Sequence, residues 1–277
     1  MLLGLTGGIA TGKSTVSSLL RQPPYNLPII DADVLAREVV DPGTPGYRAI
    51  VSHFGPSTPD LLLPTDHPQC GGAENGPNGK GRPLNRPALG RRVFGGENDE
   101  EKARDRKVLN GIVHPAVRRA MYKATLREYL RGSWAVVWDI PLLFESGWEP
   151  LCGTVLVVAV HDPEVQMQRL RDRNPELSAE DAENRVLSQM SITEKVEKAE
   201  ARGKGWGEVV WNDGDKVQLE KEVARVMREI RENSPWWWSW LLLLCPPAGA
   251  AAATWSVGRS WWVQRQITQE KGPKAKL

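Results

Sequence analysis

A glycine-rich run near the start of the chain has residue types and spacing that suit polyphosphate binding. Gly7 and Gly12 enclose four residues, and Lys13 and Ser14 follow directly, which is the Gly-x-x-x-x-Gly-Lys-Ser/Thr pattern of a P-loop. The backbone N–H groups of such a loop and the start of the helix after it point at the same anion. Lys13 can reach the β- and γ-phosphates, and the Ser14 hydroxyl can bind magnesium. The run therefore predicts a site for ATP and Mg²⁺.

A P-loop alone does not separate kinases from GTPases, ATPases and motor proteins. The chain has no Asn-Lys-x-Asp run, which reads guanine in GTPases, and its 277 residues contain no second ATPase module. A kinase acting on a small molecule is the class that remains. We expect ATP to contact the whole loop, namely Gly7, Gly8, Ile9, Ala10, Thr11, Gly12, Lys13, Ser14 and Thr15.

Two aspartates follow the apolar run 27–30, where a strand beside the loop would end. A carboxylate at this edge of a parallel sheet can orient an acceptor hydroxyl and take its proton. Asp33 is the favoured base, with Asp31 either capping the next helix or acting on magnesium through a water molecule. Asp139 closes a later apolar run and is predicted to be a magnesium ligand, with a helix cap as the open alternative.

Arginines supply the remaining charge that phosphoryl transfer needs. Arg169 and Arg173 are four residues apart and so share one face of a predicted helix. Guanidinium groups on a mobile helix can neutralise the charge on a transferring phosphoryl group, although exposed arginines are common on any protein surface.

Short apolar runs alternate with longer mixed segments through the first two thirds of the chain. The runs are nearly continuous in Val, Ile or Leu, which is typical of strands covered on both faces. The predicted strands are 2–5, 27–30, 135–140, 154–160 and 209–211. The predicted helices are 13–21, 33–40, 114–130, 163–173, 179–190 and 216–232. This alternation predicts an α/β fold with a doubly wound parallel sheet.

Composition argues against several classes of function. A net charge of +2 with 25% charged residues gives no bulk electrostatic attraction to nucleic acid. The three cysteines are far apart, so neither a disulfide framework nor a zinc site is indicated, and a reducing compartment is expected. The strand predicted at the N-terminus leaves no room for a cleavable presequence.

Several short stretches of the sequence, taken in order, resemble those of the dephospho-coenzyme A kinase family, in the eukaryotic type with a hydrophobic C-terminal tail. Their order and approximate spacing hold from residue 1 to residue 225. The most specific pieces are Thr6-Gly7-Gly8-Ile9 and Pro141-Leu142-Leu143-Phe144-Glu145. The other matching pieces are Gly12-Lys13-Ser14, Asp31-Ala32-Asp33, Leu84-Asn85-Arg86, Leu89-Gly90, Val93-Phe94, Leu109-Asn110, His114-Pro115, Arg169 to Arg173, Arg185, Gln189-Met190 and Asn212-Asp213-Gly214.

The resemblance implies a P-loop fold like that of the nucleoside monophosphate kinases, with a helical acceptor-binding region and an arginine-bearing lid. It implies transfer of the ATP γ-phosphate, with magnesium, to the ribose 3′-hydroxyl of dephospho-coenzyme A. Asn212 and Gly214 match the loop near the ATP adenine. The catalytic residues it implies are Lys13, Asp33, Arg169 and Arg173, and the acceptor-binding residues are Asp33, Arg86, His114, Leu142 and Glu145.

Three segments depart from the family pattern. One of them, Arg202-Gly203-Lys204-Gly205-Trp206, interrupts the stretch before Val209-Val210-Trp211. Ala10 and Thr11 stand where relatives usually have Gly-Ser, and Ala10 fits if its backbone angle is ordinary. Residues 55–83 enlarge a loop that is short in most relatives. They are rich in Gly and Pro and have no period, so a mobile surface insertion is expected, with cover over the substrate as the alternative.

The last part of the chain differs in composition and is expected to lie outside a kinase domain formed by residues 1–233. Residues 234–258 carry no charge, have Trp clusters and exceed the roughly 20 residues of a transmembrane helix. Basic residues follow them, which suits an anionic membrane surface. Three interpretations of residues 234–277 remain: a membrane anchor or hairpin turning at Pro246-Pro247, a hydrophobic patch for a partner, and packing onto the kinase core. The first would attach a cytoplasmic catalytic domain to an intracellular membrane.

Overall fold

The computed structural model describes residues 1–94 and 100–233, together with ten positions of the tail. These positions are Pro247, Ala251, Thr254, Trp255, Gly258, Arg259, Trp261, Trp262, Val263 and Arg265. The chain divides into two compact units. We call Met1–Ile30 with Arg127–Leu277 the sheet unit, and Asp31–Leu126 the helical unit.

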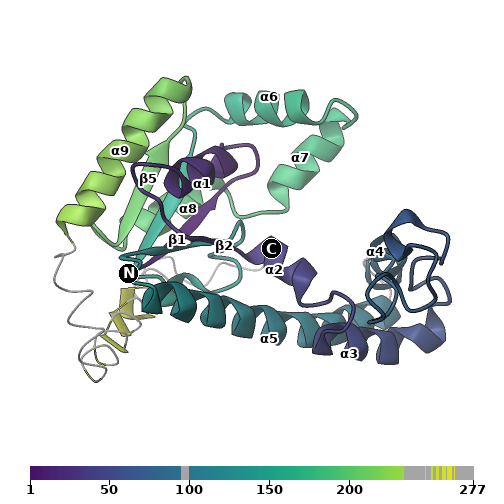
Figure 1. Ribbon diagram of the computed structural model, residues 1–277. Helices are drawn as coiled ribbons and strands as arrows, with labels where there is room; N and C mark the ends of the chain where they lie inside the picture. Colours follow the sequence, from purple (N-terminus) through teal and green to yellow (C-terminus); the bar gives the residue numbers. More distant parts are fainter. Residues whose placement is uncertain are drawn as a thin grey trace. The chain divides into compact units, whose positions relative to one another are not determined.

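The sheet unit is built on strands that lie in the order β2-β3-β1-β4-β5 (Figure 1). The strands are β1 (Leu2–Gly7), β2 (Ile29–Asp31), β3 (Val136–Asp139), β4 (Thr154–Ala159) and β5 (Gly207–Trp211). β1 pairs in parallel with both β3 and β4, and β4 pairs in parallel with β5. Every residue of β3 and β4 is buried, as expected for strands covered on both faces. The predicted parallel α/β class is confirmed.

Helices cover both faces of this sheet. The helices of this unit are α1 (Lys13–Arg21), α6 (Pro163–Arg173), α7 (Ala179–Leu187), α8 (Ile192–Glu200) and α9 (Lys216–Glu232), with the short turn η3 (Glu149–Leu151). Leu156 of β4 lies in one core with Val16 of α1 and Val223 of α9. Figure 1 shows α1 and α9 side by side on this face. Successive strand side chains point to opposite faces, so Val157 faces the other side, where α8 contacts β4 and β5.

The helical unit has its own hydrophobic core. Its helices are α2 (Ala32–Glu38), α3 (Pro45–Phe54), α4 (Arg86–Val93) and most of α5 (Glu100–Leu130), with the turns η1 (Gly55–Ser57) and η2 (Pro68–Cys70). Tyr47 and Phe54 of α3 share this core with Val93 of α4, and Ile112 of α5 packs against it. This core therefore holds α4 and the residues Val39 and Val40, which directly follow α2.

The boundaries of several helices differ from those expected. α5 begins at Glu100 and continues through Pro115, so the predicted start at residue 114 is wrong. Proline is common in the first turn of a helix because it has no N–H to donate, which is why the pattern favoured a start there. α7 ends at Leu187 and not at residue 190, and the N–H of Met190 donates to the Glu145 carboxylate. The sequence pattern does not predict α3, α4 or α8.

Residues 55–83 form a series of turns that are tied to the helical unit. Leu62 forms a β-bridge with Leu84, and the Tyr47 hydroxyl donates a 2.7 Å hydrogen bond to the carbonyl of Arg82. Cys70 within this segment is fully buried. The segment thus has packed residues of its own, while its mobility and any cover over a substrate stay predictions.

The predicted anchor over 234–258, with its turn at Pro246-Pro247, lies largely outside the described residues. Among the residues that are described, no helix is both long and apolar enough to cross a bilayer. The guanidinium of Arg259 lies 4.0 Å from the ring centroid of Trp206 in the sheet unit. Here Arg259 of the tail contacts the ring of Trp206, which directly precedes β5.

Candidate active site

The P-loop has no room for side chains at its motif glycines. A Cβ on Gly7 would lie 2.7 Å from the carbonyl oxygen of Val158. Gly12 has a φ of 95°, in the left-handed region, and a Cβ there would lie 2.2 Å from Nδ2 of Asn212. Glycine is therefore required at Gly7 by close approach and at Gly12 by backbone conformation as well.

Ala10 has a φ of 60°, so the expectation of an ordinary backbone angle is wrong. A residue with a Cβ is disfavoured in the left-handed region by roughly 1–2 kcal/mol, because the Cβ approaches the following carbonyl. The turn of the loop imposes this angle whichever residue stands there. A glycine, which the resemblance leads us to expect at this place, would adopt it freely.

Side chains from two distant segments hold the carbonyl groups of the loop. Gln166 of α6 donates from Nε2 to the carbonyl of Ile9 at 2.7 Å. Asn212, directly after β5, donates from Nδ2 to the carbonyl of Thr11 at 2.8 Å. Both side chains are buried, and a Cβ on Gly8 would lie 2.9 Å from Nε2 of Gln166. The shape of the loop is therefore fixed from outside, which prepares it for a ligand.

Lys13, the first residue of α1, forms an ion pair with Asp139 at the end of β3. The lysine side chain is 20% exposed and the aspartate only 6%. In the described part of the chain no side chain caps the start of α1, and its first turn carries no acidic residue. Ser14 and Thr15 are exposed there. Uncapped N–H groups and the positive end of the helix dipole favour an anion, so this end of α1 suits a phosphate group.

The predicted adenine loop is tied to the arginine-bearing helix. Arg169 of α6 donates from Nη1 to the carbonyl of Asn212 at 2.8 Å. Asn212 is therefore held at its main chain by α6 and holds the P-loop with its side chain. Gly214 lies close to the start of α9, where an added Cβ would lie 1.5 Å from Oε1 of Gln218.

A histidine and an aspartate interact at the same edge of the sheet. The N–H of His161 and its ring Nδ1 each lie 2.7 Å from an oxygen of the Asp213 carboxylate. The His161 ring stacks on Trp211, with ring centroids 3.6 Å apart. Partial burial raises the pKa of Asp213, but the contacts with His161 and the charge of Arg169 hold that pKa below its ordinary value. This aspartate is therefore kept ionised.

The two predicted lid arginines differ in their surroundings. Arg169 is partly buried by its contact with Asn212, whereas Arg173 is exposed at the end of α6. The predicted helix boundaries at this place are confirmed. The catalytic role of both arginines stays a prediction.

On the helical unit, Asp31 is the cap of α2. Its carboxylate accepts hydrogen bonds from the N–H groups of Asp33 at 2.8 Å and Val34 at 3.0 Å. The capping alternative for Asp31 is thus confirmed. Asp33 lies in the first turn of α2, two residues after the end of β2.

Two further predicted acceptor residues belong to the helical unit. Arg86, the first residue of α4, donates to the carbonyl of Arg37 at 3.3 Å and lies 3.8 Å from the carboxylate of Asp41. These contacts place its guanidinium beside the C-terminal end of α2. His114 is exposed on α5. Their contacts with an acceptor stay predictions.

The remaining predicted acceptor residues, Leu142 and Glu145, belong to the sheet unit. Leu142 is 42% exposed. Oε1 of Glu145 lies 2.9 Å from Nζ of Lys195 and accepts a hydrogen bond from the N–H of Met190 at 3.1 Å. One oxygen of this carboxylate is thus engaged within the protein, and its contact with substrate stays a prediction.

Sequence reasoning missed two residues of this site. Gln166 and Lys195 are buried polar side chains on helices. Gln166 donates to the carbonyl of Ile9 in the P-loop, and Lys195 donates to the carbonyl of Pro141, two residues after Asp139. For Lys195 a signal was available: it shares a helix face with Ile192 and Ala199, where an apolar residue would be expected. Gln166 gave no comparable signal, because glutamine is ordinary on an exposed helix face.

Ser14 and Asp139 fit magnesium by the chemistry of their oxygen atoms. A hydroxyl and a carboxylate are the hard ligands that this ion prefers, and magnesium is usually held by one or two protein oxygens together with phosphates and water. Among the described residues, no cluster of three or more His, Cys, Asp or Glu side chains is arranged to hold a metal ion. A magnesium site completed by phosphates and water does not need such a cluster.

Comparison with known proteins points to one family. A family model described as dephospho-CoA kinase matches residues 1–66 and 74–205, with its gap inside the segment 55–83. The chain is 42% identical over 231 residues to the dephospho-CoA kinase CAB5 of Saccharomyces cerevisiae, covering 83% of each. It is 42% identical over 228 residues to a dephospho-CoA kinase of Bacillus cereus, covering 82% of this chain and 96% of that protein.

A solved structure agrees with the sequence comparison. The dephospho-CoA kinase from Campylobacter jejuni superposes with a TM-score of 0.57 at 26% identity, covering 84% of this chain and 98% of that one.

Proposed function

Because this chain belongs to the dephospho-CoA kinase family, we propose that it transfers the γ-phosphate of ATP to the ribose 3′-hydroxyl of dephospho-CoA. The products are coenzyme A and ADP, so the reaction completes coenzyme A biosynthesis. The observation that carries this proposal is the P-loop itself, whose glycines leave no room for a Cβ and whose carbonyls are anchored by Gln166 and Asn212.

Asp33 is the base in this reaction. Its carboxylate orients the 3′-hydroxyl and accepts its proton as the oxygen forms a bond to the γ-phosphorus. The bond between that phosphorus and the bridging oxygen of ADP breaks, and ADP leaves with the electron pair. The first turn of α2, capped by Asp31, supports a fixed position for Asp33.

Lys13 and the two α6 arginines stabilise the charge that develops on the transferring group. Lys13 contacts the β- and γ-phosphates from the start of α1, and Arg169 and Arg173 neutralise the phosphoryl oxygens. Such transfer reactions depend mainly on positioning and electrostatics, because the protein forms no covalent bond. The contact of Arg169 with Asn212 supports a link between the lid helix and the nucleotide.

Magnesium would be held by Ser14 and by Asp139, directly or through water. When bound, it neutralises charge on the β- and γ-phosphates. Asp139 already pairs with Lys13, so its carboxylate can orient the lysine ammonium and also serve as a metal ligand.

The experiment that tests this proposal identifies the product. The full chain is incubated with ATP, magnesium and dephospho-CoA, and the product is analysed by phosphorus NMR and mass spectrometry. We expect a new phosphomonoester on the ribose 3′-oxygen. The 3′-deoxy analogue of dephospho-CoA is the matched control, and we expect no transfer to it. Transfer to this analogue at a similar rate would overturn the assignment of the accepting hydroxyl.

A second proposal concerns residues 234–277. We propose that this tail binds an anionic membrane surface. Trp255, Trp261 and Trp262 are exposed, and the exposed Arg265 follows them, a combination that suits the interface of a bilayer. Co-sedimentation of the full chain with vesicles containing anionic lipid is the test, with alanine at the three tryptophans as the control variant. Wild-type protein that stays in the supernatant would contradict the proposal.

A further inference from the structure

Lys195 of α8 is a fully buried lysine, with an exposed fraction of 0% for its side chain. It lies on the face of α8 that turns toward the sheet, as Ala199 one turn later does, and Ala199 is also fully buried. Taking an ammonium out of water is costly unless its charge and N–H groups are satisfied. The environment of Lys195 must therefore supply specific partners.

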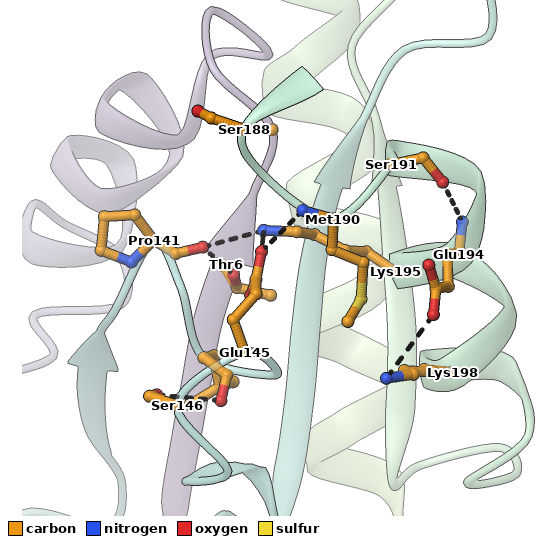
Figure 2. Close-up of polar contacts among 12 residues, drawn as sticks. Thr6, Pro141, Glu145, Ser146, Ser188, Met190, Ser191, Glu194, Lys195 and Lys198 are labelled. Atoms are coloured by element: carbon orange, nitrogen blue, oxygen red, sulfur yellow. Dashed lines mark hydrogen bonds and ion pairs between the residues drawn. The ribbon is translucent and has the colours of Figure 1, made fainter. Parts of the chain in front are cut away.

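Those partners are a carbonyl and a carboxylate (Figure 2). Nζ of Lys195 donates to the carbonyl of Pro141 at 3.0 Å and lies 2.9 Å from Oε1 of Glu145. The same Pro141 carbonyl accepts a 2.8 Å hydrogen bond from the Thr6 hydroxyl. The same Glu145 oxygen accepts a hydrogen bond from the N–H of Met190. One ammonium on α8 thus connects three other segments of the sheet unit, at Thr6, at Pro141 with Glu145, and at Met190.

Two of these segments lead directly to residues of the proposed reaction. Thr6 precedes Gly7, where the P-loop begins, and Pro141 follows Asp139 after one residue. Met190 lies in the connection between α7 and α8, and α7 separates it from the lid arginines of α6. Figure 2 shows Lys195 reaching between Pro141 and Glu145, with Met190 beside them.

A buried ion pair is weak evidence for stability, because an apolar side chain of similar volume often serves the core as well. Its contribution is better sought in geometry, since two bonded partners fix the positions of the segments that carry them. We propose that Lys195 is a positioning residue for phosphoryl transfer, acting through Glu145 and Pro141 on the P-loop, on Asp139 and on the connection between α7 and α8. This inference rests on the proposed kinase function.

The test replaces Lys195 by methionine, which fills the same volume without the charge. We expect kcat for transfer to dephospho-CoA to fall on the order of 10²-fold, as a small misplacement of reacting groups does. We expect KM for ATP to change less than about 3-fold, because the ground-state contacts of the P-loop remain. Lys198→Met on the same helix is the control, because Lys198 is partly exposed and pairs only loosely with Glu194, at 3.8 Å. Its kcat should stay within about 2-fold of the wild type.

A double-mutant cycle tests the route through Glu145. If Lys195 acts through this carboxylate, Lys195→Met combined with Glu145→Gln should be no slower than the slower single variant. Multiplying defects would show independent roles and overturn the route. Hydrogen exchange gives a reading that needs no activity: the Met190 amide should exchange at least about 10-fold faster in Lys195→Met than in the wild type. Unchanged exchange in a folded variant would also overturn it.

The outcomes separate the two proposals. A wild-type chain that transfers no phosphate to dephospho-CoA contradicts the proposed function. A wild-type chain that does, beside a folded Lys195→Met variant with unchanged kcat, contradicts only the positioning role. If Lys195→Met does not fold, Glu145→Leu decides alone, because leucine can accept a hydrogen bond from neither Met190 nor Lys195. A kcat unchanged in that variant would overturn the inference.

Discussion

Lys13 and Asp139 form an ion pair although they lie 126 positions apart in the chain. The parallel pairing of β1 with β3 brings them together, since Asp139 is the register partner of Leu5 just before the loop. The P-loop lysine is thereby held next to a nearly buried carboxylate at the edge of the sheet. This relationship links the nucleotide motif to the predicted magnesium ligand, and it leads to the first prediction.

Replacing Lys13 by methionine should lower kcat by about 10²- to 10³-fold, the loss typical when one donor to a developing charge is removed. Steady-state kinetics with ATP and dephospho-CoA measure this. Lys216→Met is the matched control, because Lys216 also starts a helix but is exposed on α9. Equal effects of the two substitutions would contradict the role given to Lys13.

The loop glycine at position 12 and the alanine at position 10 should respond in opposite ways. Gly12→Ala places a Cβ at φ 95° and 2.2 Å from Nδ2 of Asn212, so we expect destabilisation by about 1–3 kcal/mol and at least about 10-fold weaker ATP binding. Ala10→Gly removes the left-handed strain of Ala10. A gain in folded-state energy of about 1 kcal/mol is partly offset by the greater freedom of glycine in the unfolded chain.

Thermal unfolding and ATP titration of both variants check this contrast. Ala10→Gly should keep the melting temperature or raise it slightly, with activity within about 2-fold of the wild type. A clear loss of stability in Ala10→Gly would show that the angle at Ala10 is not strained.

Two glutamines on α6 provide a matched pair. Gln166 is buried and donates to the carbonyl of Ile9, whereas Gln168 is exposed and donates to Asp172. Gln166→Ala leaves a loop carbonyl without its buried donor, so we expect a loss of about 1–3 kcal/mol of stability and a raised KM for ATP. Gln168→Ala should change stability by less than about 0.5 kcal/mol. Urea unfolding compares them, and similar losses would contradict the anchoring role of Gln166.

Sequence reasoning predicts the elements with clear local signals and misses those that depend on distant contacts. The bounds of α1, α6 and α9 follow from their apolar faces, and Asp162 and Asp215 cap the last two as side-chain acceptors. α8 escapes prediction because Lys195 interrupts its apolar face. The partner of that lysine, Pro141, lies 54 positions away, a relation that no local pattern contains.

The candidate site shows the same difference between features with local sequence signals and features that depend on distant contacts. The motif predicts Lys13 and the loop glycines, because their spacing is a local property of the chain. The P-loop anchor formed by Asn212 is not predicted, although the residue itself is singled out for the adenine loop. Its bond to Thr11 joins positions 201 residues apart and depends on the order of strands, which one sequence does not contain.

Burial raises the pKa of the Cys152 thiol from 9.0 to about 12. The negative charge of Glu149 also raises this pKa, whereas the positive charge of Arg202 lowers it. This thiol stays neutral in the folded protein. Its contribution to stability is therefore fully present below pH 9 and is lost as the pH rises from 9 toward 12, because only the unfolded chain then releases the proton.

Urea unfolding at pH 8 and pH 10 measures this effect, with Cys152→Ala as the reference. The wild type should lose about 1 kcal/mol more than the variant between these pH values. Equal losses would mean that the thiol titrates alike in the folded and unfolded chain.

The account as a whole is tested most directly by ADP formation from ATP and magnesium with the full chain. Dephospho-CoA is compared with a panel of nucleosides and nucleotides as acceptors, and Asp33→Asn is run beside Asp31→Asn. We predict turnover with dephospho-CoA alone, reduced at least about 10³-fold in Asp33→Asn. Asp31→Asn should lose far less, because asparagine also caps helices. Turnover with another acceptor, or an Asp33→Asn variant as active as the wild type, would contradict the account.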